Sequence, residues 1–363
     1  MSFSSKCRET ADACRFCWMC RHICPVGNTT GQERNTARAR ALSLSLVGRG
    51  AAELKGDLVQ NVYECALCRA CTEDCKTGWD PVIFTREARR EAVLAGEAPE
   101  AVRLLLETYG KTGHIYGAEP KNKAFSDAAR RHAAKTDTLL YLGSDVRHFA
   151  KDKALGAIAL LERAKVSFTV LEKEPESGRQ LSFLCGDTKE TRDAMQAAAE
   201  LYSGYKTVVF YDPEDARTAK QDAPELGITA KAKLLPFPAY LETLIGKKLK
   251  VKKSENVYTF QDPAALARAL EDVSSARAVL AACGELKEML LAGKETVLAG
   301  DLILDRYLHE VVLGMARRRW DEAVNMGART LVTADTAEYL ALSATKPKGV
   351  RVITLEEAVA ECL

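Results

Sequence analysis

The sequence predicts a multidomain protein of the α+β class, with a helical N-terminal domain followed by two α/β halves built on parallel sheets. Three observations carry this prediction. Nine of the twelve cysteines lie in the first 75 residues. Eight of them form two groups in the sequence, and the segment between these groups is rich in alanine, leucine and arginine. From about Thr138 onward, short apolar strands alternate with amphipathic helices, which is typical of parallel sheets covered by helices. The alternation fills two blocks of about 110 residues each, which indicates an internal duplication.

Composition narrows the class of protein. The chain has 363 residues, a formal net charge of +2 and a hydrophobic fraction of 47%, so it shows no overall basic balance that would indicate nucleic-acid binding. No run of about 18 apolar residues occurs, and we expect no direct membrane span. The chain starts with the polar stretch MSFSSKCRETADACRF, which lacks the apolar core of a secretory signal. We therefore expect a cytoplasmic protein, peripheral to a membrane only through partners.

Two cysteine runs are the strongest indication of a metal site in the sequence. They read C-R-F-C-W-M-C-R-H-I-C-P and C-A-L-C-R-A-C-T-E-D-C-K, so both follow the spacing C-x2-C-x2-C-x3-C. In such runs three thiolates bind one [4Fe–4S] cluster and the fourth binds the other cluster. We therefore predict two [4Fe–4S] clusters. The predicted ligands are Cys14, Cys17, Cys20 and Cys75 for cluster one, and Cys65, Cys68, Cys71 and Cys24 for cluster two.

Zinc is the alternative metal for these cysteines. Zinc sites use four ligands, typically as two separated pairs. Two runs of four cysteines with the spacing C-x2-C-x2-C-x3-C do not fit that pattern. Cys7 lies outside the rhythm and is expected to be a bystander. His22 lies inside the first run and can tune a cluster by hydrogen bonding. Three later thiols are expected to be lone, small, buried hydrophobic residues: Cys185, Cys283 and Cys362.

The helical domain is expected to cover residues 1–120. The segment between the cysteine runs predicts two helices broken near Gly48–Gly50. The stretch DPVIFTREARREAVLAG predicts a further helix, and EAVRLLLETYGKTGHIYG predicts a helix that ends in a glycine-rich turn. The polar stretch KNKAFSDAARRHAAK is expected to be a cap or link before the α/β region.

The two α/β halves are expected at residues 138–246 and 254–363. In the first half we predict strands in TLLYLGSD, SFTVLEKE and KTVVFYDPED, with helices in ALGAIALLERAKV and TRDAMQAAAELYSGY. After the basic linker GKKLKVKK, the second half has a strand in VYTFQDPA and a long helix in HEVVLGMARRRWDEAVNMG. It closes with the strand and helix patterns ARTLVTADTAEYL and VRVITLEEAVAECL.

Charge is distributed unevenly over the cysteine-rich region. Residues 1–50 hold eight Lys/Arg and three Asp/Glu, a balance of +5, whereas residues 51–100 hold six and ten, a balance of −4. Two interpretations remain open at this point. The charges belong either to solvated helix faces or to docking surfaces of opposite sign for redox partners.

This arrangement of motifs resembles a known family. Two cysteine runs, then PEAVRLLLETYGKTGHIYG, then two α/β halves resemble the iron–sulfur subunits of glycolate oxidase, anaerobic glycerol-3-phosphate dehydrogenase and lactate-utilisation systems, and heterodisulfide reductase subunits share the plan. The resemblance implies a helical ferredoxin-like domain and two degenerate cysteine-rich domains. It also implies an FAD-dependent flavoprotein oxidoreductase as partner, with a further electron carrier on the other side.

In that family each α/β half carries a lone cysteine, a Cys-Cys-Gly and a Cys-x-x-Cys pair. The matching positions here are Ser144, Glu176–Ser177–Gly178 and Asp212 with Asp215 in the first half, and Ala264, Leu298–Ala299–Gly300 and Asp335 with Glu338 in the second. Only the glycines remain, so the α/β region is expected to be a retired catalytic module that serves as a docking scaffold. Asp212 and Asp215 either bind a hard cation or, as we favour, are solvated turn formers.

The expected function is that of a non-catalytic electron-transfer subunit in an oxidoreductase complex. No G-x-G-x-x-G follows a strand, and no Ser-His-Asp order is visible. The five histidines are scattered singly and are expected to be surface or packing residues, so no catalytic residue is predicted. Two alternatives remain: a catalytic subunit of the heterodisulfide-reductase type, and a non-redox interaction protein whose clusters are structural.

Overall fold

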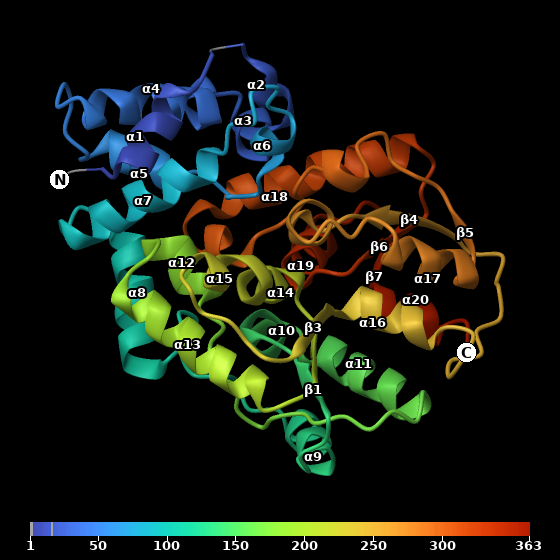
Figure 1. Ribbon diagram of the computed structural model, residues 1–363. Coiled ribbons are helices and arrows are strands. Elements are labelled where there is room, and N and C mark those ends of the chain that lie inside the picture. Colours follow the sequence, from blue (N-terminus) through green and yellow to red (C-terminus); the bar gives the residue numbers. More distant parts are fainter. Residues whose placement is uncertain (1–2, 16) are drawn as a thin grey trace.

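The computed structural model describes residues 3–15 and 17–363, and its N-terminal third is helical (Figure 1). The helices of this part are α1 (Ser5–Asp12), α2 (Met19–Ile23), α3 (Pro25–Thr30), η1 (Glu33–Asn35), α4 (Ala37–Gly48), α5 (Asp57–Tyr63), α6 (Ala70–Glu73), α7 (Pro81–Leu94), α8 (Glu100–Thr112) and α9 (Lys123–Arg131). The predicted break near Gly48–Gly50 is confirmed, because α4 ends at Gly48. The stretch KNKAFSDAARRHAAK was expected to be a cap or link but contains α9, which buries Phe125.

The first α/β unit is built on a parallel three-stranded sheet with the order β1-β2-β3. Its elements are β1 (Thr138–Tyr141), α10 (Ser144–Phe149), α11 (Lys151–Arg163), α12 (Arg179–Cys185), α13 (Lys189–Ser203), β2 (Thr207–Phe210), α14 (Pro213–Arg217), the π-helix η2 (Thr218–Asp222), α15 (Ala223–Glu225), β3 (Lys233–Pro236) and α16 (Phe237–Leu244). In the register, Leu139 lies opposite Val208, and Val208 lies opposite Leu234.

The strand predicted in SFTVLEKE is wrong. Only Thr169 pairs with the sheet, through a single bridge to Leu139. Beyond it, the buried guanidinium of Arg147 donates hydrogen bonds to the backbone carbonyls of Leu171 and Glu172. Those carbonyls are therefore satisfied by a side chain instead of a neighbouring strand, and the chain leaves the sheet.

The second α/β unit is built on a parallel four-stranded sheet with the order β5-β4-β6-β7. Its elements are β4 (Val257–Gln261), the π-helix η3 (Ala265–Ala269), α17 (Ser275–Cys283), β5 (Glu285–Leu286), η4 (Gly293–Glu295), α18 (Leu302–Asn325), β6 (Thr330–Thr333), α19 (Thr336–Thr345), β7 (Arg351–Thr354) and α20 (Leu355–Ala360). The prediction of parallel sheets with covering helices is confirmed. No helix in the described ranges combines the length and apolar character that crossing a bilayer requires.

The helical region and the second α/β unit share one apolar core. Figure 1 shows α18 beneath the helical region, and α18 contacts α3 directly. A Cβ at Gly314 of α18 would lie 2.4 Å from the Thr29 side chain of α3, so the two helices need glycine at this crossing. Trp320 of the same helix is fully buried and donates its indole N–H to the Leu342 carbonyl at 2.9 Å.

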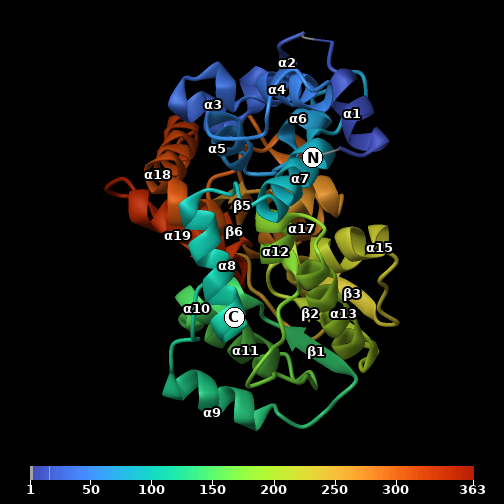
Figure 2. The same cartoon turned by 90° about the vertical axis from the view of Figure 1, so that its left-hand side faces the viewer.

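The two α/β units also pack on each other. Helix α16 of the first unit contacts α17 of the second, and α11 contacts α20. The Tyr211 hydroxyl donates a buried hydrogen bond of 2.7 Å to Glu356. Figure 2 shows that α8 runs from the end of α7, beside the cysteine-containing helices, towards α9 at the far end of the first α/β unit. The cysteine-rich region is therefore anchored to both α/β units.

Candidate iron–sulfur sites

Each cysteine run contains a non-glycine residue in the left-handed backbone conformation at the same place. Trp18, directly after Cys17, has φ 70°, and Arg69, directly after Cys68, has φ 59°. Each residue precedes a short helix, α2 or α6, which carries the third cysteine of its run. Left-handed non-glycine residues are strained and concentrate at functional sites. The two runs therefore adopt matching, strained turns around their cysteines.

The four cysteines predicted for cluster one line one cavity. This cavity lies between the two runs and is also bordered by Trp18 and Trp79; its cysteines are Cys14, Cys17, Cys20 and Cys75, with Cys71 at its wall. Cys17 is exposed and Trp18 is 42% exposed, so this cavity lies near the protein surface. The fourth cysteine of the second run thus lies with the first three of the first run.

The four cysteines predicted for cluster two line a second cavity, which is bordered by apolar residues, Arg40 and Arg69. Its cysteines are Cys24, Cys65, Cys68 and Cys71. Cys24 also caps the start of α3, where its Sγ accepts a hydrogen bond from the Gly27 backbone N–H at 3.4 Å. Because Cys71 lines both cavities, the two cavities adjoin each other at this residue.

The thiols of the second cavity are crowded in an environment that disfavours their charged form. Burial raises the pKa of Cys24 to about 11, and Arg40 opposes that rise. Burial raises the pKa of Cys71 well above its usual range, and the neighbouring Cys68 and Cys65 raise it further. Thiolates packed this closely need a strongly cationic partner. Iron in a [4Fe–4S] cluster provides such a partner, so the donor set fits this group.

Comparison with known proteins agrees with this chemistry. Residues 10–79 match the family described as a 4Fe–4S dicluster domain. The N-terminal region is a ferredoxin-like 4Fe–4S domain. A protein of Chromohalobacter salexigens named "Probable membrane-anchored ferredoxin" is 25% identical over an alignment of 325 residues, and the match covers 78% of this chain and 48% of that protein. The chain thus spans about half the length of this curated relative.

A solved structure shares the fold over almost the whole chain. It is the crystal structure of a hypothetical protein from Helicobacter pylori, which is 11% identical and aligns with a TM-score of 0.55. The alignment covers 99% of this chain and 73% of that chain. At this identity the likeness shows the fold alone.

The remaining cysteines lie outside both cysteine-lined cavities. Cys7 is buried in α1, and Cys185 is buried in α12. Cys283 and Cys362 were expected to be lone thiols, but they lie side by side: the Cys362 thiol donates to the Cys283 carbonyl at 3.3 Å. Their predicted burial is confirmed. His22 is exposed at the edge of the 4Fe–4S domain.

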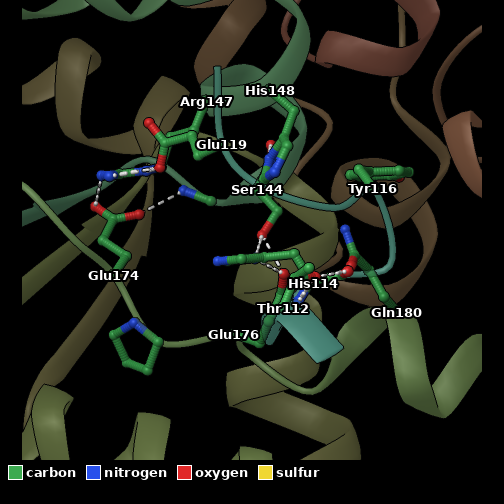
Figure 3. Close-up of polar contacts among 12 residues, drawn as sticks. Thr112, His114, Tyr116, Glu119, Ser144, Arg147, His148, Glu174, Glu176 and Gln180 are labelled. Atoms are coloured by element: carbon green, nitrogen blue, oxygen red, sulfur yellow. Dashed lines mark hydrogen bonds and ion pairs between the residues drawn. The ribbon is translucent and has the colours of Figure 1, made fainter. Parts of the chain in front are cut away.

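In the first α/β unit, several positions matched to family cysteines come together, and Figure 3 shows two of them, Ser144 and Glu176, in contact. The Ser144 hydroxyl donates to Glu176 at 2.5 Å, and the Ser177 hydroxyl donates to Asp215 at 2.5 Å. His114 also contacts Glu176, at 2.5 Å through Nδ1, and this hydrogen bond raises the pKa of His114. The side chains at these positions are therefore hydrogen-bonded to one another.

Two expectations about this region are wrong. Asp212 and Asp215 are not solvated: they are 1% and 5% exposed, and burial raises the pKa of Asp212 to about 7. No group of three or more His, Cys, Asp or Glu in the described ranges could hold a single metal ion, so the cation alternative gains no support. The histidines are not all scattered either, because the rings of His114 and His148 lie 5.1 Å apart. The topology that joins these segments is not visible in the local sequence.

In the second α/β unit, the matched positions also meet. Glu338 is fully buried and accepts hydrogen bonds from the Ala299 backbone N–H at 3.1 Å and from Gln261 at 2.8 Å. Burial raises the pKa of Glu338 to about 8. Asp335 caps α19 by accepting from the Glu338 backbone N–H at 2.8 Å. A carboxylate thus lies beside the glycine-containing segment in both units.

The glycine of this segment in the second unit gives a stability prediction. A Cβ at Gly300 would lie 2.5 Å from the Ala337 carbonyl oxygen, so Gly300→Ala is expected to lower the free energy of unfolding by about 1–3 kcal/mol through overpacking. Gly110→Ala in α8 is the control, because open space surrounds that site and alanine favours helix. Urea unfolding followed by circular dichroism checks both variants, and equal stability of G300A and the wild type would contradict the close contact.

Proposed function

We propose that this chain is the electron-transfer iron–sulfur subunit of a flavin-dependent oxidoreductase complex. One observation carries the proposal: two cavities, one lined by Cys14, Cys17, Cys20, Cys71 and Cys75 and the other by Cys24, Cys65, Cys68 and Cys71, have Cys71 in common. Such a pair of sites suits two [4Fe–4S] clusters close enough for electrons to pass between them. The proposed ligands are Cys14, Cys17, Cys20 and Cys75 for cluster one, and Cys65, Cys68, Cys71 and Cys24 for cluster two.

The protein supplies position, access and electrostatics for this chemistry, whereas the clusters supply one-electron redox capacity. The cavity of cluster one opens toward the surface beside Cys17 and Trp18. The Arg38 guanidinium stacks 3.7 Å from the centre of the Trp18 ring. This face is the proposed docking surface for a redox partner, since electron transfer requires close approach. The name of the Chromohalobacter relative, a probable ferredoxin, agrees with an electron-transfer role.

The α/β region is proposed to be a retired, duplicated cysteine-rich module spanning residues 138–246 and 254–363. Its support is the side-chain chemistry at the matched positions. Hydrogen-bonded pairs such as Ser177–Asp215, and the buried Glu338, occupy places where the resembling iron–sulfur subunits carry thiolates. The region then serves as a scaffold that holds the 4Fe–4S domain and contacts partners. That role matches the resemblance to iron–sulfur subunits of glycolate oxidase and heterodisulfide reductase type.

Iron and acid-labile sulfide analysis of anaerobically purified protein tests the number of clusters. We expect about eight irons and eight sulfides per chain, with two interacting S = 1/2 signals in low-temperature EPR after reduction. About four irons per chain, or zinc in stoichiometric amount, would overturn the proposal of two clusters.

Isolation of the chain from its native host tests the partner. We expect an FAD-containing protein to co-purify and to reduce the clusters when its substrate is added, as followed by loss of the cluster absorbance. A matched sample of the chain alone should show no reduction by that substrate. Full substrate turnover by the isolated chain would contradict the role of a non-catalytic subunit.

A further inference from the structure

Seven arginines are almost completely buried in the described part of the chain, and they fall into two groups. Four of them form ion pairs with carboxylates: Arg147, Arg179, Arg217 and Arg319. The other three form no ion pair with any described carboxylate: Arg40, Arg89 and Arg268, which are 2%, 0% and 4% exposed. Arg40 lines the cavity of Cys24, Cys65, Cys68 and Cys71, whereas Arg89 and Arg268 donate hydrogen bonds to the backbone carbonyls of Cys65 and Cys68.

Arg268 reaches this cavity from the second α/β unit. It lies in η3, and its guanidinium donates to the Cys68 carbonyl at 2.6 Å. Its other donors bind the backbone carbonyls of Lys294, at 2.9 Å, and Thr296. The side chain is therefore fixed in place by three backbone segments, and none of these contacts neutralises its charge.

Arg40 and Arg89 approach the same thiols from the 4Fe–4S domain. Arg40 lines the cavity, donates through Nε to the Asn61 carbonyl at 2.9 Å, and has no hydrogen-bond partner for Nη2 in the described ranges. Arg89 donates to the Cys65 carbonyl at 2.5 Å and to the Phe183 carbonyl at 2.7 Å. One buried cation thus lines the cavity, and two more bind the backbone of cysteines that line it.

A buried charge without a partner costs several kcal/mol in real proteins, on the order of the free energy of a whole domain. For the four paired arginines, carboxylates offset the free-energy cost of burying the charge. At the second cavity the compensating negative charge would come from the bound group itself, because a [4Fe–4S] core with four thiolates is an anion. The first cavity differs, since two of the cations that line it, Arg15 and Lys76, are exposed to solvent, and the third, Arg38, is paired with Glu33 at 2.7 Å.

We propose that Arg268, together with Arg40 and Arg89, raises the reduction potential of cluster two above that of cluster one. Reduction adds one electron and therefore one negative charge, which buried cations stabilise more strongly than screened surface charges do. An electron delivered by the flavoprotein partner at the exposed cluster one would then rest on cluster two. Arg268 acts by placing a positive charge near cluster two. Through this residue the α/β region controls the reduction potential of a cluster in the 4Fe–4S domain. This inference depends on the proposed pair of clusters.

EPR-monitored redox titration of the full-length, cluster-loaded protein tests the inference. A Cys65→Ser variant first assigns the signal of cluster two. We then expect Arg268→Met to shift the midpoint potential of cluster two to a more negative value and to shift cluster one much less. Arg268→Lys, which keeps the charge, should retain most of the wild-type potential. Arg192→Met removes an exposed charge from α13 and is expected to change neither potential.

Each outcome decides the question. An unchanged cluster-two potential in R268M, or equal shifts of both clusters, overturns the role of Arg268. If R268M fails to retain cluster two while R268K retains it, a buried charge is required at this position, which supports the inference. Loss of cluster two in both variants would mean that the shape of the arginine side chain, and not its charge, is required, and would overturn the inference. Arg40→Gln gives an independent check with the same expected negative shift. A wild-type protein without two clusters refutes the proposed function instead, before any variant is compared.

Discussion

Replacing Cys71 with serine is expected to remove cluster two and to disturb cluster one. The Cys71 thiol lines both cavities, so its loss takes a proposed ligand from one site and a wall from the other. A serine hydroxyl does not replace a thiolate on iron. We expect the iron content to fall from about eight to about four or fewer per chain. Electron transfer from the reduced flavoprotein should fall by more than about 100-fold, beyond the usual effect of changing an outer-shell residue.

Cys283→Ala is the matched control for this variant. Cys283 is fully buried and lies in α17 beside Cys362, outside both cavities. Its replacement should leave iron content, EPR signals and electron transfer unchanged. Full iron content in C71S would refute the ligand assignment, and loss of iron in C283A would reveal a ligand that the assignment omits.

The second large effect is expected from Arg89→Met. Arg89 joins the 4Fe–4S domain to the first α/β unit by hydrogen bonds to the carbonyls of Val62, Cys65 and Phe183. Methionine would leave these buried acceptors without their donor, at a cost of about 1–3 kcal/mol for each unsatisfied group. Because such costs are not additive, we expect a total loss of about 3–5 kcal/mol in the free energy of unfolding.

Arg90→Met separates this effect from a general effect of charge. Arg90 is the next residue of α7, retains 29% of its side-chain exposure and pairs with Glu91 at 3.0 Å. Its loss should change the free energy of unfolding by less than about 1 kcal/mol. Urea unfolding of both variants, followed by tryptophan fluorescence, provides the comparison. Similar midpoints for R89M and R90M would show that the buried contacts of Arg89 contribute little.

Local sequence patterns predicted most of the helices and placed the cysteine runs within a helical region. The break near Gly48 and the strand at Thr138 follow from composition and periodicity, which act over a few residues. The cysteine spacing is also local, since the first three thiols of each run lie within seven residues of one another. These features could be read from the chain because each depends on neighbours in sequence.

The errors arose where distant segments meet. The segment around Leu171 reads as a strand, but its carbonyls bind Arg147, 24 residues earlier. Asp212 and Asp215 read as solvated turn formers, yet the packing of α12 and α14 encloses them. Likewise, an arginine in a helical pattern reads as a solvated residue, so nothing in the local sequence marked Arg268 as a buried cation beside Cys68. Burial of polar groups is decided by topology.

The shared core beneath α18 has a consequence for how the protein is made. The eight cysteines of the two runs are synthesised early, whereas Arg268 and helix α18, which packs on α3, are synthesised much later. Until they arrive, the nascent cysteine region has an exposed apolar underside and lacks one of its buried cations. Iron loading is thus expected to finish only after translation is complete. The maturation machinery then meets a nearly finished protein instead of an emerging peptide.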